Sequence, residues 1–298
     1  MADELASQPR CWLRAAALLP DVAGLLPRPG ERVAVTGCGS SWFMAMAYAR
    51  LRESAGDGVT DAFAASEPPA RGGYQRLIAL TRSGTTTEVL DLLASVRGTV
   101  PTVAITAAPH TPVADAADAV IGLDFADERS VVATRSSTST LALLRASLGQ
   151  DVAPAAEQAT NALDVDLAGL VSAEQVTFLG RGWTIGLAHE AALKLREAAG
   201  GWTESYPAME YRHGPISIAQ PGRVVWMFGA PPAGLADDVA RTGATFLDSG
   251  IDRDPMAHLV VAQRLAVAMA AARGLDPDRP RNLARSVVLE PATPHYPS

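Results

Sequence analysis

The chain has 298 residues, of which 48% are hydrophobic, and its formal net charge is −7. This length accommodates one large or two medium domains with a sizeable core. The negative charge argues against nucleic acid and against anionic membrane surfaces as partners. The two cysteines, Cys11 and Cys38, make no disulfide framework, which fits a reducing compartment. We therefore expect a cytoplasmic protein in which any anionic ligand is held by local backbone dipoles and hydroxyl groups.

Neither end of the chain predicts an export signal or a membrane anchor. The start, MADELASQPR, is polar and unlike a secretory signal. No apolar run approaches the roughly 20 residues that a membrane helix needs. The alanine-rich stretch over 259–272 includes Gln263 and Arg264, so we expect a packed helix there.

Short apolar runs alternate with amphipathic stretches, which is typical of α/β folds with parallel sheets. We expect strands over 32–36, 61–65, 76–80, 103–106, 119–123, 176–180, 224–228 and 244–247. We expect helices over 10–19, 42–53, 88–96, within 150–172, from Thr184 to about Glu197, over 235–241 and over 255–273. The runs VAVTGCGSS and VTFLGRGWT share a strand, a glycine turn and a helix start, which indicates duplicated α/β units.

Two loops that follow strands in the first half are rich in hydroxyl groups. GCGSS at 37–41 offers Ser40 and Ser41, and TRSGTTT at 81–87 offers five hydroxyls and Arg82. Hydroxyl donors beside a helix N-terminus suit a phosphate monoester, and the carboxyl ends of parallel strands meet at one edge of a sheet. GCGSS matches neither GxGxxG nor the Walker pattern, so a dinucleotide or a nucleoside triphosphate is not expected. An ordinary helix cap is the alternative interpretation of the GCGSS loop, whereas the five hydroxyls of the second loop exceed what one cap needs.

Two further segments have open interpretations. The hydroxyl run over 134–140 is either a wall of a ligand site or a solvated loop. The tail over 276–286 is basic and punctuated by proline, a composition typical of a solvated loop.

The densest cluster of ionisable residues lies between 189 and 215. Glu190, Lys194 and Glu197 are spaced by four and three residues, which places them on one face of a helix. His213 follows before a Gly-Pro turn. A carboxylate beside an ammonium, with an imidazole on a rigid loop, can move protons on and off a sugar. Alternatively, these are a solvated Glu-Lys pair and a turn histidine. The five histidines show no metal-ligand spacing, so no metal is expected.

Taken together, these segments resemble the double-SIS (sugar isomerase) family, in particular the isomerase half of glucosamine-6-phosphate synthase and the related amino-sugar-phosphate isomerases and deaminases. The resemblance is carried, in the family's order, by GCGSS (37–41), ASE (65–67), LTRSGTTTE (80–88), ERSVVAT (128–134), FLGRG (178–182), HEAALKLRE (189–197), ESYPAMEYRHGP (204–215) and RNLARSVVLE (281–290). It implies an α/β fold of two flavodoxin-like SIS subdomains with parallel sheets flanked by helices. We expect an N-terminal helix at 1–28, a phosphate-binding domain at 29–153 and a catalytic domain at 154–298.

The resemblance also implies roles for individual residues. We assign the phosphate to the two hydroxyl loops, with the family's phosphate ligands at Ser41, Thr81, Ser83 and Thr86 and with Ser40, Arg82 and Thr85 beside them. The resemblance makes Glu197 the base at C1 and C2, with Glu190 and Lys194 as its companions and Arg285 as a further catalytic residue. It makes His213 the ring-opening residue. This histidine is donated by the partner subunit of a homodimer with shared sites. Arg285 stands where the family often has lysine, and Arg82 where the synthase has glutamine. An arginine holds its proton more firmly than a lysine and does not readily form a Schiff base.

The expected function is enzymatic and needs no cofactor. The substrate is an amino or N-acetylamino hexose 6-phosphate, which undergoes ring opening and abstraction of the C2 proton, with isomerisation or deamination as the outcome. No glutaminase domain accompanies the motifs, so synthesis of glucosamine 6-phosphate from glutamine is not expected. Two alternatives stay open: a dehydratase or lyase that eliminates the C3 substituent, which Arg285 favours, and a non-catalytic sugar-phosphate sensor, against which Glu197 and His213 argue.

Overall fold

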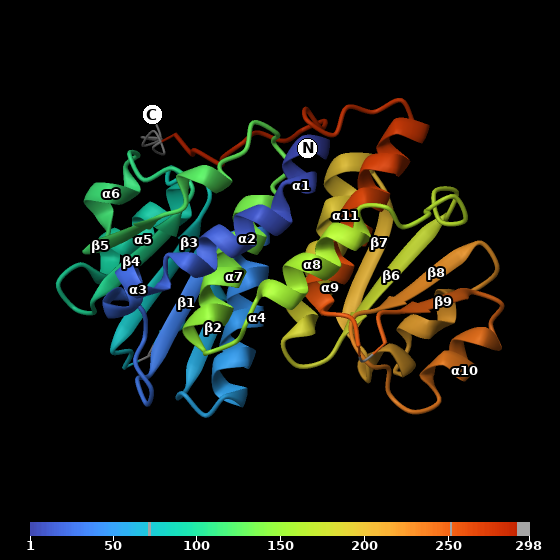
Figure 1. Cartoon of the computed structure of the whole chain (residues 1–298), viewed down its shortest axis with the longest axis horizontal. Helices are drawn as coiled ribbons and strands as arrows, with labels where there is room; N and C mark the ends of the chain where they lie inside the picture. The colour runs from blue at the N-terminus through green and yellow to red at the C-terminus, as the bar shows by residue number, and fades with distance from the viewer. Residues whose placement is uncertain (71–72, 251, 291–298) are drawn as a thin grey trace, which may run out of the picture.

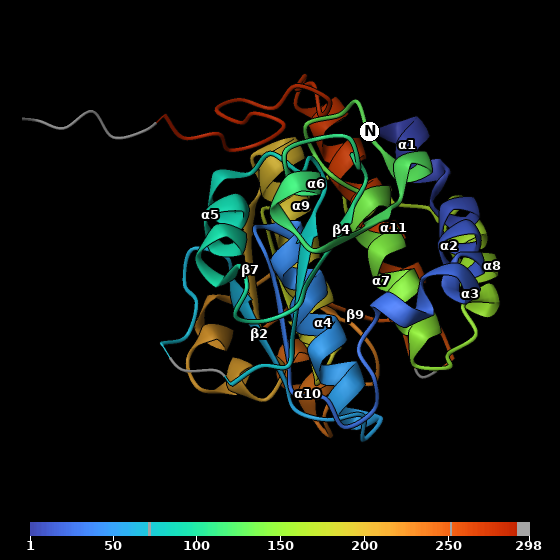
Figure 2. The ribbon, with the colours of Figure 1, turned by 90° about the vertical axis from the view of Figure 1, so that its left-hand side faces the viewer.

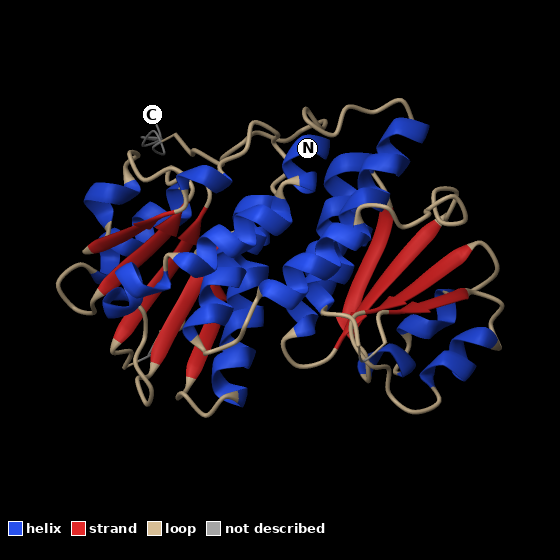
Figure 3. Ribbon diagram, viewed as in Figure 1, coloured by secondary structure: helices blue, strands red, loops and turns tan. Residues whose placement is uncertain are grey.

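The computed structural model describes residues 1–70, 73–250 and 252–290. Two parallel sheets lie at opposite ends of the molecule, and a layer of helices fills the space between them (Figure 1). Figure 3 shows the same arrangement by secondary structure, with further helices on the outer side of each sheet. This is the predicted α/β architecture, with two separate parallel sheets flanked by helices.

The strand order of the first sheet is flavodoxin-like. It runs β2-β1-β3-β4-β5, with β1 (Val33–Gly37), β2 (Thr60–Ala64), β3 (Arg76–Thr81), β4 (Thr102–Thr106) and β5 (Ala119–Gly122). The second sheet runs β7-β6-β8-β9, with β6 (Gln175–Gly180), β7 (Trp202–Pro207), β8 (Arg223–Met227) and β9 (Thr245–Asp248). Every neighbouring pair is parallel. The predicted duplication is visible, because β1 and β6 hold the same place in their sheets.

The helices divide into an inner layer and outer covers. Between the sheets lie α2 (Gln8–Ala17), α4 (Ser40–Ser54), α7 (Arg135–Ser147), α8 (Ala153–Ala162), α9 (Thr184–Ala199) and α11 (Pro255–Ala272). The remaining helices are α1 (Ala2–Ala6), α3 (Leu19–Val22), α5 (Thr87–Val96), α6 (Val113–Ala116), α10 (Leu235–Ala240) and the 3₁₀ turns η1 (Ala23–Leu25), η2 (Asp124–Ala126), η3 (Glu210–Arg212) and η4 (Pro215–Ile218). Helices α5 and α6 cover the outer face of the first sheet, and α10 covers that of the second.

One apolar core joins the two halves. Trp12 of α2, Tyr48 of α4, Leu141 of α7, Leu195 of α9 and Leu265 of α11 are all buried in a single cluster. The N-terminal helices pack on α7 and α8 and so tie the chain's start to the centre of the molecule. The domain boundaries expected from the sequence stay predictions.

Helix α11 is the predicted packed helix. Among the described residues it alone is long and apolar enough to cross a membrane, with 18 residues and a mean hydropathy of 1.3. Its residues are 67% buried and belong to the central core. Burial in that core accounts for its apolar composition.

Three features of the structure differ from what composition suggests. Residues 202–207 form strand β7, which is not among the predicted strands; it pairs with β6 alone, and its consecutive polar residues Thr203, Glu204 and Ser205 suit a sheet edge. Of the two interpretations of the hydroxyl run over 134–140, the solvated loop is wrong, because the run begins the buried helix α7. The tail is not free in solvent: it returns across the top of the molecule above α9 toward α5 (Figure 2).

Candidate functional site

The two hydroxyl loops converge, as predicted, at the carboxyl ends of the adjacent strands β1 and β3. Together they form one side of a hollow of about 210 Å³. The polar side chains of these loops that line it are Ser40, Ser41, Thr81, Arg82, Ser83 and Thr86, and Cys38 and Gly39 line it beside them. Gly84 makes the second turn possible, because its φ of +64° disfavours a side chain and a Cβ there would lie 2.0 Å from Thr111 Oγ1.

Helix α9 brings the ionisable cluster of the second half to the same hollow. Lys194 and Glu197 line it, and Lys194 Nζ donates a hydrogen bond of 3.0 Å to Ser40 Oγ. The same ammonium donates to Glu197 Oε2 and lies 3.5 Å from Glu190 Oε1. The loops of one half and the carboxylate of the other therefore face each other within one chain.

Burial sets the charges of this cluster. Glu190 and Lys194 are fully buried, whereas the side chain of Glu197 keeps 20% exposure. Burial raises the pKa of Glu190 to about 7. Burial opposes the charge of Lys194, but the carboxylates of Glu190 and Glu197 outweigh it and raise the pKa of the ammonium. Lys194 is thus a cation at neutral pH, and it holds the partly exposed carboxylate of Glu197 in place.

The helix N-termini differ in their freedom to receive an anion. Helix α7 is already capped by a carboxylate of the chain, because Glu128 Oε1 accepts hydrogen bonds from the backbone N–H groups of Thr134 (2.6 Å) and Arg135 (2.9 Å), and Oε2 accepts from Ser136 Oγ. Helices α4 and α5 begin at the rim of the hollow, where the N–H of Thr87 in α5 donates to the backbone carbonyl of Val287 and to no side-chain carboxylate. A ligand phosphate would therefore meet α4 and α5.

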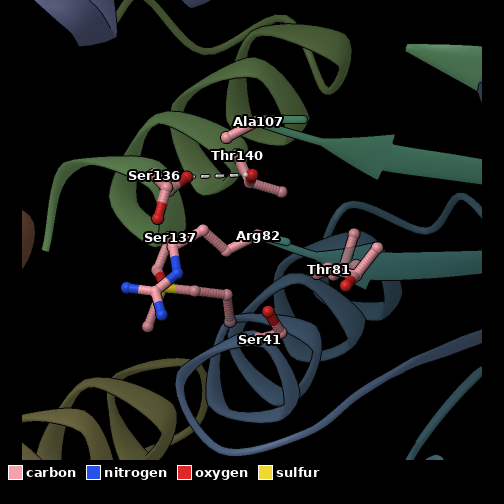
Figure 4. A pocket seen from close by; sticks show the side chains of 9 residues that line it. Ser41, Thr81, Arg82, Ala107, Ser136, Ser137 and Thr140 are labelled. Carbon is pink, nitrogen blue, oxygen red and sulfur yellow. Dashed lines mark hydrogen bonds between the residues drawn. The ribbon is translucent and has the colours of Figure 1, made fainter. Parts of the chain in front are cut away.

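The hydroxyl run of α7 contributes to the wall behind the loops. Ser137 lines the hollow, and Ser136 and Thr140 line a small adjoining cavity of about 10 Å³. Figure 4 shows Ser136, Ser137 and Thr140 on α7 opposite Ser41 and the end of β3. The position of the hydroxyl run over 134–140 therefore agrees with the interpretation that it forms a wall of the site.

Arg82 is tied to the chain itself. Its guanidinium donates to the carbonyls of Ser130 (3.1 Å), Val131 (2.9 Å) and Arg285. Burial lowers its pKa. Arg82 lines the hollow, but its hydrogen bonds to three carbonyls make it a link between β3, the 128–134 segment and the tail.

The tail brings Arg285 to the hollow, where the resemblance implies it. Its guanidinium forms an ion pair with the carboxylate of Asp127 and donates to the carbonyl of Glu128. The charge of Arg285 is therefore balanced within the chain. This docking contradicts the solvated tail expected from composition.

Three predicted residues lie off the lining. Glu190 is enclosed behind Lys194, and Thr85 points its hydroxyl to Ser83 Oγ (3.0 Å). His213 is exposed at the end of η3 and does not line the hollow of its own chain. That His213 enters the hollow of a partner subunit therefore stays a prediction.

Sequence reasoning missed part of the lining. Ser286, Val131 and Ala133 all border the hollow. They lie within the segments ERSVVAT and RNLARSVVLE, so the signal was present in the resemblance. No local pattern marks them as site residues, since a serine after an arginine is unremarkable by itself.

Residues 28–148 match the model of the SIS domain. The glutamine–fructose-6-phosphate aminotransferase of Gluconobacter oxydans is 28% identical to this chain, and the match covers 89% of this chain and 53% of the relative. That of Pyrobaculum aerophilum is 30% identical, covering 72% and 43% respectively. The chain thus spans about half the length of these curated relatives.

Solved structures of the same fold include glucosamine-6-phosphate deaminase from Thermotoga maritima, with a TM-score of 0.79, 25% identity and coverage of 96% of this chain and 99% of that one. Tagatose-6-phosphate ketose/aldose isomerase from Escherichia coli also has a TM-score of 0.79, at 19% identity, covering 98% and 96%. This second likeness shows the fold alone. Residues 28–148 therefore form a SIS domain, and over most of its length the chain is similar to proteins of the phosphosugar isomerase and deaminase type.

Proposed function

We propose that this chain is an enzyme that opens the ring of an amino or N-acetylamino hexose 6-phosphate and removes its C2 proton, acting as an amino-sugar-6-phosphate deaminase or an aldose–ketose isomerase. The observation that carries the proposal is the placement of Glu197 and of two hydroxyl loops around one hollow of about 210 Å³. A carboxylate base and a cluster of neutral donors are what this reaction requires of a protein. The likeness to a glucosamine-6-phosphate deaminase at 25% identity supports deamination as the first outcome to test.

The phosphate end of the substrate binds the loops. Ser41, Thr81, Ser83 and Thr86 donate hydroxyl hydrogen bonds, and the N-termini of α4 and α5 add their positive dipole ends. This end of the substrate does not react. Its binding energy therefore serves to orient the sugar carbons against Glu197.

The proton transfers begin with ring opening. His213 of a partner subunit takes the proton from the O1 hydroxyl and returns one to the ring oxygen, which leaves an aldehyde at C1. The aldehyde acidifies the proton on C2, and Glu197 removes it. An enolamine results from an amino sugar, and an enediol from a hydroxy sugar.

The second half of the reaction returns this proton to C1. An amino sugar then carries an imine at C2, which water hydrolyses to a ketose 6-phosphate and ammonia; a hydroxy sugar gives the ketose directly. Lys194 orients Glu197 through its hydrogen bond to Oε2, and the buried Glu190 positions Lys194. Arg285 anchors the tail through Asp127 and need not exchange a proton. A homodimer with shared sites and a cytoplasmic location belong to the same proposal.

The proposal is tested with purified protein and a panel that includes glucosamine 6-phosphate and its N-acetyl form. We expect release of ammonia together with formation of a ketose 6-phosphate from the free amine. An unsaturated sugar chromophore from the N-acetyl form would instead support elimination of the C3 substituent. Binding without turnover of any substrate would contradict an enzymatic role and favour a sensor.

A further inference from the structure

The tail places one hydroxyl among the residues proposed to hold the phosphate. Ser286 Oγ lies 3.0 Å from Ser83 Oγ, 2.9 Å from Thr85 Oγ1 and 3.4 Å from Thr86 Oγ1. Ser83 Oγ donates to Ser286 Oγ, and the single hydrogen of Thr85 Oγ1 has both Ser83 Oγ and Ser286 Oγ within reach. Ser286 Oγ therefore accepts from these hydroxyls as a phosphate oxygen would. Ser286 lines the same hollow as Glu197.

The backbone on the far side of Ser286 continues along the start of α5. The carbonyl of Val287 accepts a hydrogen bond of 3.1 Å from the N–H of Thr87, in the first turn of that helix. The N–H of Leu289 donates to Thr87 Oγ1 at 2.8 Å. The tail thus occupies one donor of a helix start, the N–H of Thr87, which is the kind of group that an anion uses.

The anchors of the tail on the near side lie outside this hydroxyl cluster. Arg285 pairs with Asp127 and donates to the Glu128 carbonyl, and its own carbonyl accepts from Arg82. None of these contacts uses the hydroxyls of Ser83, Thr85 or Thr86. The Ser286 side chain can therefore leave the cluster while Arg285 stays in place.

We propose that Ser286 Oγ holds the position of a phosphate oxygen in the hydroxyl cluster and is displaced when the substrate phosphate binds. This inference rests on the proposed phosphate site and adds a residue that sets its affinity. A hydroxyl has a single hydrogen to donate, so Ser83 and Thr85 cannot serve Ser286 and a phosphate at once. Competition within the chain then lowers the apparent affinity for phosphate, because part of the population is closed to it.

Titration calorimetry with inorganic phosphate tests this competition. Ser286→Ala removes the internal acceptor, and we expect phosphate to bind roughly three- to tenfold more tightly than to the wild type. Ser286→Asp tethers an anion in the cluster and should weaken binding by more than about tenfold. The matched control is Val288→Ala, two residues along the tail, whose side chain is 67% exposed; it should bind like the wild type.

A second variant locates the phosphate. Thr86→Val should weaken phosphate binding by about tenfold or more if the anion occupies the cluster, because it removes one of the donors, and circular dichroism checks that each variant is folded. Equal or weaker binding by Ser286→Ala, with binding still weakened in Thr86→Val, would overturn the role of Ser286 and leave the phosphate site intact. Absence of phosphate binding in the wild type and in Ser286→Ala, or binding that is unchanged in Thr86→Val, would overturn the phosphate site itself and this inference with it.

Discussion

Lys194 contacts groups from both halves of the chain. Its buried ammonium meets Ser40 of the first half and the carboxylates of Glu190 and Glu197 on its own helix. A buried charge of this kind is stable only while its partners remain, because removing one of them leaves an uncompensated ion. The same buried ion cluster therefore holds the proposed base Glu197 and contributes to the stability of the fold.

Glu197→Gln keeps the shape of the side chain and removes the base. We expect turnover of the phosphosugar substrate to fall by at least about 100-fold, with phosphate binding changed less than about threefold. Steady-state kinetics and calorimetry measure the two effects. Glu157→Gln on the exposed face of α8 is the matched control; unchanged turnover in Glu197→Gln would remove this carboxylate from the role of base.

Glu190→Gln should flatten the dependence of stability on pH. The pKa of Glu190 is raised by burial from 4.5 to about 7, so the folded chain keeps a proton that the unfolded chain releases. The stability from this group is present below about pH 4.5 and is lost as the pH rises through 7, by an amount on the order of 3 kcal/mol. Denaturant unfolding of both proteins between pH 5 and pH 8 measures the difference, and parallel profiles would contradict the raised pKa.

Two helices determine the geometry of the site at the scale of elements. Helices α4 and α9 run in opposite senses, so that Gly186 lies against Ala47 while Lys194 reaches Ser40. A Cβ on Gly186 would lie 2.3 Å from the carbonyl oxygen of Phe43. The close approach of the two helices therefore depends on this glycine, eight residues before the lysine that it brings to the hydroxyl loop.

Gly186→Ala should force α4 and α9 apart. We expect the free energy of unfolding to fall by about 1–3 kcal/mol, because the clash with backbone outweighs the better helix propensity of alanine. Denaturant unfolding measures the loss. Gly169→Ala is the control, since nothing lies within 4 Å of its added Cβ. Equal free energies of unfolding for the two variants would contradict the close packing of α4 against α9 at Gly186.

The sequence predicted elements well where local pattern and tertiary environment agree. The apolar strands β1, β3 and β6 were expected within two residues of their observed bounds. The sequence does not predict strand β7, because Thr203, Glu204 and Ser205 in its middle are polar and the strand pairs with β6 alone. An edge strand of this composition has the same residue pattern as a loop. The docked tail was missed from composition, since its contacts join residues about 200 positions apart; the resemblance, not the local chemistry, brought Arg285 into the site.

At the scale of the whole molecule, the hollow belongs to both halves at once. The first half supplies donors, the second half supplies Lys194 and Glu197, and the tail adds Arg285 and Ser286 to the lining. A common apolar core holds the halves together, so the facing groups do not depend on a flexible linker. His213, which the proposal makes catalytic, is exposed and does not line the hollow of its own chain.

A mixing experiment tests whether His213 comes from a partner subunit. Glu197→Gln and His213→Ala should each be inactive, yet unfolding and refolding them together should restore about a quarter of the wild-type activity, because half of the dimers are mixed and each holds one intact site. Sedimentation checks the dimer. If His213→Ala were inactive and the mixture stayed inactive although mixed dimers form, the histidine would not cross between subunits.

The central claim is that Glu197 removes the proton from C2 of a hexose 6-phosphate held by the hydroxyl loops. Proton NMR in heavy water follows that proton directly for each member of a panel of hexose and amino-hexose 6-phosphates. We predict loss of the C2 proton signal with at least one of them, followed by the signals of a ketose 6-phosphate, and no loss with Glu197→Gln. A C2 proton that persists in every phosphosugar the protein binds would contradict the account.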